Sequence, residues 1–228
     1  NNVFIGFDAA GATTSIDKSV IIGYSAVSDS NITGSDAEGT IAIGYQSLKA
    51  LTTGTNMAIG YQSGLAITTG LGNIAIGYNS MLAYTNIGVI RNTAIGFQTM
   101  MTGINHVATD NTVLGFQAFS DASTDSNHTV AIGYQAGKAI TSGDGNIMIG
   151  AGAGNTTTDV DKTVIVGQSA GQANMTADAD GTIAIGYEAG KAITSGQQST
   201  LLGYQAGYTL TTGDANTAVG HNALYHNV

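Results

Sequence analysis

Ile41-Ala-Ile-Gly-Tyr45 is the stretch that decides the fold, because the same five-residue motif, here called the word, recurs along the whole chain. It returns almost unchanged as Met57-Ala-Ile-Gly-Tyr61, Ile74-Ala-Ile-Gly-Tyr78, Val130-Ala-Ile-Gly-Tyr134 and Ile183-Ala-Ile-Gly-Tyr187. Its glycine occurs thirteen times, at Gly6, Gly23, Gly44, Gly60, Gly77, Gly96, Gly115, Gly133, Gly150, Gly167, Gly186, Gly203 and Gly220. Successive glycines lie 16 to 21 residues apart, most often 17. The repeat leaves no segment that would form a different domain, so we expect one repeat domain over residues 1–228.

Each word is short, rich in β-branched residues and bounded by Gly, Asn, Asp, Ser and Thr, a pattern that predicts a strand. A repeat of about 17 residues is too short for a helix–turn–helix or a propeller blade. It suits one coil of a β-solenoid, in which each coil forms hydrogen bonds with the next at a spacing of about 4.8 Å. The sequence therefore predicts an all-β fold, a parallel β-solenoid or β-roll of about 13 coils.

A longer period lies over the short one. The stretch Asp17–Gly23 recurs at Asp161–Gly167, and the stretch from Asn31 to Gln46 recurs from Asn174 to Glu188. Repeats one to five (residues 1–78) therefore look like a copy of repeats nine to thirteen (residues 145–222). Growth by block duplication suits an elongated object, and we interpret the chain as a fragment of a longer fibre.

The alternation of residues within each word predicts which side chains share a face. The position before each glycine is always Ile, Leu or Val, and two residues earlier stand nine aliphatic residues and four threonines. We predict that these positions form the core of the coil, with Ile43, Ile59, Ile76, Ile95, Ile132, Ile149 and Ile185 as its most regular members. The position between them points the other way, and the small residues there are Ala42, Ala58, Ala75, Ala94, Ala131, Ala184 and Ala218.

None of the thirteen middle positions is polar, which a strand facing water would require. Both faces of the strand are therefore predicted to be buried. We infer a homo-oligomer in which the alanines let the copies approach a common axis. The alternative is a wider coil that closes over this face internally.

The position after the glycine is Tyr or Phe in ten of the thirteen repeats, and glutamine often follows. Stacked from coil to coil, these glutamines are expected to form an amide ladder. They are Gln46, Gln62, Gln98, Gln117, Gln135 and Gln205.

Composition excludes several classes of function. Six basic residues against fifteen acidic ones give a net charge of −9, which is unsuited to nucleic-acid binding or to anionic membranes. The chain has no cysteine, which removes disulfides, thiol nucleophiles and cysteine-bound metals. No apolar run approaches the roughly 18 residues that cross a bilayer, so we expect no membrane insertion.

The candidate catalytic and metal-binding residues do not form a known site motif. The four histidines are His106, His128, His221 and His226, of which the last two lie at the C-terminal end and would meet their copies on a trimer axis. The acidic pairs Asp36/Glu38, Asp159/Asp161 and Asp178/Asp180 have turn spacing, without the repeat signature of calcium-binding β-rolls. No nucleophile elbow is present. We expect no enzyme activity, no cofactor and no metal.

The words Asn-Thr-Ala-Ile-Gly-Phe at Asn92–Phe97 and Asn-Thr-Ala-Val-Gly-His at Asn216–His221 resemble repeats of trimeric surface fibres. One such group is the Gly- and Asn-rich repeat of phage tail fibres, and another is the YadA-like head of trimeric autotransporter adhesins. The resemblance covers all thirteen repeats, although the adhesin repeat is shorter, nearer 14 residues. It implies a left-handed β-roll, three chains around one axis, and an extracellular location on a virion or bacterial surface.

The leading functional hypothesis is therefore a structural and adhesive segment of a homotrimeric fibre that attaches to a host, with a surface glycan or a matrix protein as partner. An adhesin head is one alternative. A monomeric binding solenoid, such as an ice-binding protein, and a passive spacer are two others.

Overall fold

The structure is a computed structural model that describes residues 1–13, 16–29, 32, 37–85, 88–103, 107–121 and 126–226. These residues contain thirteen strands of three residues each and one short 3₁₀ turn, η2 (Ala177–Ala179). The strands are β1 (Val3–Ile5), β2 (Val20–Ile22), β3 (Ile41–Ile43), β4 (Met57–Ile59), β5 (Ile74–Ile76), β6 (Thr93–Ile95), β7 (Thr112–Leu114), β8 (Val130–Ile132), β9 (Ile147–Ile149), β10 (Val164–Val166), β11 (Ile183–Ile185), β12 (Thr200–Leu202) and β13 (Thr217–Val219).

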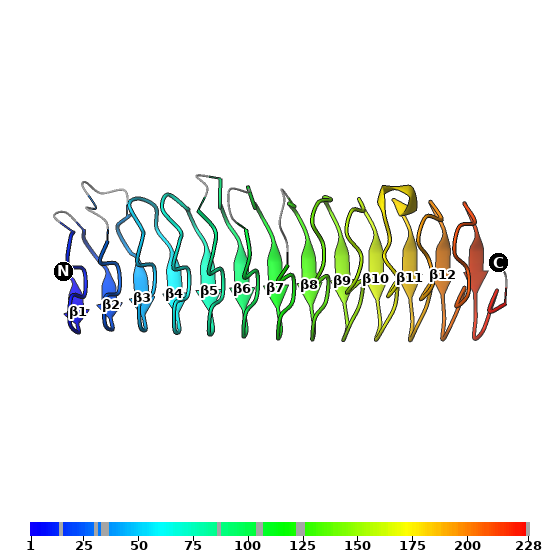
Figure 1. Cartoon of the computed structure of the whole chain (residues 1–228), viewed down its shortest axis with the longest axis horizontal. Coiled ribbons are helices and arrows are strands. Elements are labelled where there is room, and N and C mark those ends of the chain that lie inside the picture. Colours follow the sequence, from blue (N-terminus) through cyan, green and yellow to red (C-terminus); the bar gives the residue numbers. More distant parts are fainter. Residues whose placement is uncertain are drawn as a thin grey trace. The chain divides into compact units, whose positions relative to one another are not determined.

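The chain divides into two compact units, unit 1 from Asn1 to Asn111 and unit 2 from Thr112 to Val228. In unit 1 the strands β1 to β6 pair in sequence order, each parallel to the next and in register, so that Ile41 lies beside Met57 and Met57 beside Ile74. In unit 2 the strands β7 to β13 pair in the same way. Each coil thus supplies one strand (Figure 1), and the predicted all-β parallel solenoid is confirmed.

The glycine after each strand is required by the close approach of successive coils. Gly44 has φ +137°, and its amide donates to the carbonyl of Ile22 at 2.7 Å. A Cβ on Gly44 would lie 2.2 Å from the carbonyl oxygen of Gly60, well inside van der Waals contact. Only glycine fits this position, and for this reason it marks the repeat so regularly.

The interior of the coil is narrow, and the middle strand residue lies near the residue six positions later in the chain. A Cβ added at Gly207 would lie 2.8 Å from the Leu201 side chain, so a large middle residue here faces a glycine. In the preceding coil Ala184 and Gly190 are both small, and a Cβ added at Gly190 would lie 2.9 Å from the same Leu201 side chain. The exposed fraction of Ala184 and Leu201 is 0%. Large side chains therefore fill their own coil and the space left in the neighbouring coil, as close-packed interiors require.

A buried ladder of polar side chains precedes the strands of unit 1. The amide of Asn73 donates to Asn56 Oδ1 at 2.9 Å and to the carbonyl of Val89 at 2.7 Å. Its own Oδ1 accepts from the backbone N–H of Asn92 at 3.0 Å and from the Asn92 side chain at 3.1 Å. Asn111 repeats the pattern on Asn92. Each rung thus satisfies buried backbone groups that would otherwise lose their partners.

Replacing Asn73 with alanine is expected to destabilise unit 1 by about 2–4 kcal/mol, because the Asn92 N–H and the Val89 carbonyl both lose a buried partner. Chemical denaturation monitored by circular dichroism measures this change. Gln197→Ala is the control, since Gln197 is exposed, and it is expected to change stability by less than about 0.5 kcal/mol. Equal stabilities for the two variants would contradict a structural role for the ladder.

Candidate functional site

The outer two residues of each strand form an apolar surface, which we call the outward face. In β3 the middle residue Ala42 is fully buried, whereas Ile41 and Ile43 on either side are partly exposed. Of the 26 outer positions in the thirteen strands described, 22 are Ile, Val, Leu or Met, four are Thr, and none is charged. Some are strongly exposed, such as Leu114 and Leu202, each at 44%. The single chain therefore leaves an aliphatic ladder in water along each unit.

This burial pattern shows that the sequence-based assignment of the two strand faces is wrong. The alanines predicted to line an oligomer axis point into their own coil and are buried within one chain; they are Ala42, Ala58, Ala75, Ala94, Ala131, Ala184 and Ala218. The residues predicted to form the coil core lie on the partly exposed outward face; they are Ile43, Ile59, Ile76, Ile95, Ile132, Ile149 and Ile185. The physical reason is the direction of the middle side chain, which points into the coil: a Cβ added at Gly64 would lie 3.6 Å from Ala58, and one at Gly190 would lie 3.4 Å from Ala184. Alternation then directs the two outer residues to the surface.

A column of stacked aromatic rings runs beside the outward face, one ring after each strand glycine. In unit 1 it consists of Phe7, Tyr24, Tyr45, Tyr61, Tyr78 and Phe97, whose successive ring centroids are 5.0 to 5.5 Å apart with interplanar angles of 8° to 16°. These rings are 39% to 73% exposed. Their faces cover one another, so within the column they present ring edges and tyrosine hydroxyls to their surroundings. A sugar that stacks on an open ring face therefore finds no such face within the column.

Unit 2 carries shorter aromatic columns. Phe116 stacks on Tyr134 at 5.5 Å, and Tyr187 stacks on Tyr204 at 5.1 Å. His221 extends the second column, 5.0 Å from Tyr204. At the equivalent positions in the coils of β9 and β10 stand the non-aromatic residues Ala151 and Gln168.

The predicted glutamine ladder is confirmed for two pairs. Gln62 donates to Gln46 at 2.8 Å, and Gln135 donates to Gln117 at 3.0 Å. In the coil of β11 the column instead contains Glu188, which accepts from Gln205 at 2.7 Å.

Glu188 is the centre of a small charged cluster. Its carboxylate lies 2.5 Å from Lys191 Nζ, and the Lys191 ammonium also lies 5.3 Å from the centre of the Tyr208 ring. The hydrogen bond from Lys191, followed by the one from Gln205, lowers the pKa of the Glu188 carboxyl. The bond to Glu188 in turn raises the pKa of Lys191. The cluster joins the coils of β11 and β12, and its groups satisfy one another.

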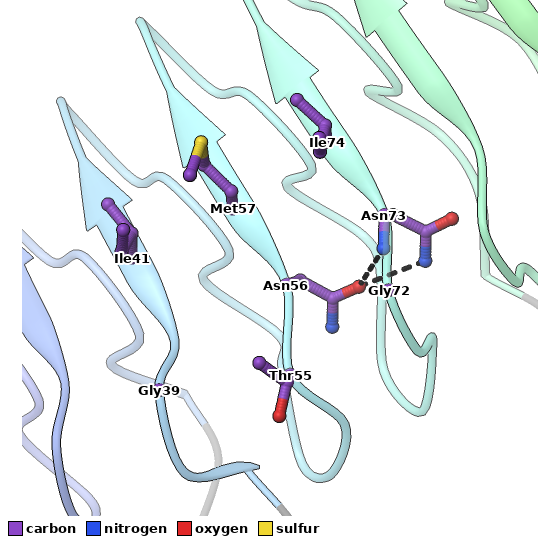
Figure 2. A pocket seen from close by; sticks show the side chains of 8 residues that line it. All are labelled: Gly39, Ile41, Thr55, Asn56, Met57, Gly72, Asn73 and Ile74. Carbon is purple, nitrogen blue, oxygen red and sulfur yellow. Dashed lines mark hydrogen bonds between the residues drawn. The ribbon is translucent and has the colours of Figure 1, made fainter.

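A shallow apolar depression lies on the outward face of unit 1, with a volume of about 190 Å³. Its floor is formed by Ile41, Met57 and Ile74 at the start of three neighbouring strands, as Figure 2 shows. The exposed residues Gly39, Thr55 and Gly72 lie at its rim, and the buried ladder residues Asn56 and Asn73 line its inner side. Small residues leave this space open, and it offers no cluster of titratable groups for catalysis.

The candidate metal ligands do not converge. Among the residues that the structure describes, no group of three or more His, Asp or Glu side chains is placed to hold an ion. His221 stacks on Tyr204, and His226 packs edge-on against Tyr225 at 4.5 Å. His106 and Asp36 lie outside the described residues.

The acidic pairs of unit 2 have a structural partner instead. Asp161 Oδ1 accepts the backbone N–H of Asp144 at 2.7 Å, and Asp180 Oδ1 accepts that of Asp161 at the same distance. These carboxylates connect one coil to the next. Across the described ranges, no helix is long and apolar enough to cross a membrane.

The buried polar ladder is the feature that sequence analysis missed. Its signal is present in the sequence, since the residue before every strand is Asn, Ser or Thr: Asn2, Ser19, Thr40, Asn56, Asn73, Asn92, Asn111, Thr129, Asn146, Thr163, Thr182, Ser199 and Asn216. A polar position that recurs in all thirteen repeats beside an apolar triplet indicates buried hydrogen bonding between coils.

The fold and surface define a parallel β-solenoid repeat protein with an uncovered apolar face. Comparisons with protein-family models, with curated proteins and with solved structures found no match.

Glu188→Gln is expected to lower stability by about 1 kcal/mol at pH 7, because it removes the ion pair with Lys191 but keeps an amide beside Gln205. The lowered pKa of Glu188 means that its contribution is present above the ordinary glutamate pKa and is lost as the pH falls through the folded value. Thermal unfolding of both proteins between about pH 3 and pH 7 tests this, with the difference vanishing at the acidic end.

Glu38→Gln is the control, since the pair that Glu38 forms with Lys18 is more exposed. It is expected to change stability by only a few tenths of a kcal/mol. A constant difference between Glu188→Gln and the wild-type protein at every pH would refute the assigned role of the Glu188 charge.

Proposed function

We propose that this chain is a structural segment of an extracellular, homotrimeric fibre that holds attachment sites at a distance from its base, as phage tail fibres do. The observation that carries the proposal is the outward face, an uncharged aliphatic ladder that one chain leaves in water. Exposed apolar surface of this regularity is typical of a protein–protein interface. In the proposed fibre the outward faces, rather than the alanines, meet at the axis.

The uncharged outward face and its regular coil spacing favour copies of the same chain as the partners. Each chain has a net charge of −9, so its copies repel one another wherever their charged surfaces meet. The outward face is the surface on which they approach without that cost. It also repeats with the coil spacing of about 4.8 Å, and a second copy of the solenoid has the same spacing along its length.

The resemblance of the repeats to trimeric surface fibres is the reason for proposing three copies rather than two. The same resemblance is the reason for proposing a location on a virion or a cell surface. A phage fibre and an autotransporter adhesin head place the same demands on this segment. Both require a stiff trimer, and both gain avidity from three identical sets of contact sites. A host glycan or matrix protein is the proposed partner, bound on the polar sides of the coils.

The ice-binding alternative is less well supported, because threonine hydroxyls are used to join the coils. Thr52 Oγ1 donates to the Thr68 carbonyl at 2.8 Å, and Thr141 Oγ1 donates to the Thr158 carbonyl at 3.0 Å. Hydroxyls that donate inside the protein do not offer those protons to an ordered water lattice. The outward face itself has only four threonines among its 26 positions.

Light scattering at several protein concentrations tests the trimer. The expected mass is three times that of one chain and is independent of concentration, because apolar burial along the whole ladder favours assembly strongly. A stable monomer at all concentrations would refute the homotrimeric fibre and leave a single-chain solenoid.

Binding of the assembled protein to bacterial surfaces and to host matrix tests the adhesive role separately. Retention on at least one surface, lost on competition with the free glycan or matrix component, is the expected result. Correct assembly without retention on any surface would identify the segment as a passive spacer.

A further inference from the structure

The depression and the aromatic column lie at opposite edges of the outward face of unit 1. The depression adjoins the residues two before each strand, Gly39, Thr55 and Gly72. The aromatic rings follow each strand by two residues, at Tyr45, Tyr61 and Tyr78 in the same three coils. The two columns are six positions apart in the chain, a separation that at about 3.3 Å per residue spans the face.

The small residues at the depression are bounded by ion pairs. In the preceding coil, that of β2, the residue two before the strand is Lys18, which pairs with Glu38 at 2.6 Å. In the two coils after them stand Arg91 and Asp110, joined by two hydrogen bonds of 2.6 and 2.7 Å. The gap therefore has a defined length of three coils, the coils of β3, β4 and β5.

A three-fold ring brings opposite edges together. Each copy in such a ring contacts its two neighbours through different parts of its surface, so the contacts are heterologous. When the outward faces surround the axis, the aromatic edge of one copy meets the opposite edge of the next at the same coil level. This geometry rests on the proposed trimer.

We propose that Tyr45, Tyr61 and Tyr78 of one copy occupy the depression beside Gly39, Thr55 and Gly72 of the next copy. The rings repeat at 5.0 Å, one per coil, and the depression extends over the same number of coils. Ring edges contact the floor of Ile41, Met57 and Ile74, and the tyrosine hydroxyls remain at the wet rim. Neither copy completes this site alone, so it fixes both the partner and the axial register.

Gly72→Asp tests the contact at a position where a side chain can be placed without a steric clash inside the chain. Gly72 has φ +71°, and an added Cβ would lie in ordinary van der Waals contact, 3.6 Å from Arg91 Cγ. Asp110 holds the same position in another coil at φ +59°, so an aspartate suits this backbone. In the assembled protein its carboxylate would be desolvated under the neighbouring rings, which is costly.

Gly145→Asp is the matched control. Gly145 has φ +70° and the same kind of neighbour, since an added Cβ would lie in van der Waals contact, 3.7 Å from Lys162 Cγ. In its coil the position of the aromatic ring is held by Ala151. Sedimentation of both variants is expected to show that Gly72→Asp raises the trimer dissociation constant at least about tenfold, and that Gly145→Asp changes it by less than about twofold. Equal effects from the two substitutions would overturn the proposed contact.

A double-mutant cycle between Gly72→Asp and Tyr78→Ala identifies the ring concerned. Tyr78→Ala alone is expected to weaken the trimer, and adding Gly72→Asp to it is expected to cost much less than in the wild-type background. Strictly additive effects would also overturn the contact. Circular dichroism of each variant confirms that the coils remain folded.

The outcomes separate this inference from the proposed function. If the wild-type protein is a trimer and the Gly72→Asp variant assembles equally well, the proposed fibre is supported and the tyrosine contact is refuted. A wild-type protein that is monomeric at every concentration removes both.

Discussion

The hydrogen bonding between successive coils is the constraint on which the rest of the structure depends. Each strand has only three residues, so it has no stability of its own and relies on the parallel neighbours in its unit. Bringing the backbones together at this spacing excludes a Cβ at the strand glycine, as at Gly44, where it would lie 2.2 Å from the carbonyl oxygen of the next coil. The need for glycine at this position, and for Asn, Ser or Thr before each strand, makes the repeat visible in the sequence.

A narrow coil has a further consequence, because it cannot bury two apolar faces of the same strand. The interior takes the middle residue and the residue six positions later, such as Leu201 with Gly207. The outer residues Ile41 and Ile43 are left outside. Both faces of the strand are therefore apolar, but they lie in different environments. The middle residues are buried inside the coil, whereas the outer residues lie on its surface and are not covered by the same chain.

This difference explains how far sequence reasoning reached. Strand positions, parallel pairing and the repeat length followed from the period of the words, because backbone pairing imposes the same period on the structure. The two faces were exchanged, because alternation shows which residues share a side but not which side is inside. The inner side is decided by the turn after each glycine, which brings the residue six positions later, such as Gly207, against the middle residue Leu201. The repeat pattern alone does not reveal the geometry of this turn.

Charged residues lie on the sides of the coils, where they join one coil to the next, and are absent from the outer strand positions. The described ion pairs Lys18–Glu38, Lys49–Asp29, Arg91–Asp110 and Lys138–Asp121 join residues 17 to 20 apart, so each ties one coil to the next. These exposed pairs contribute little individually, yet their position keeps charge away from the 26 outer strand positions. A solenoid without partners gains nothing from an uncharged aliphatic face, since that face lowers solubility and invites nonspecific contact. Its persistence through all thirteen repeats is what the proposed assembly requires, and in that assembly the polar sides of the coils would stay accessible.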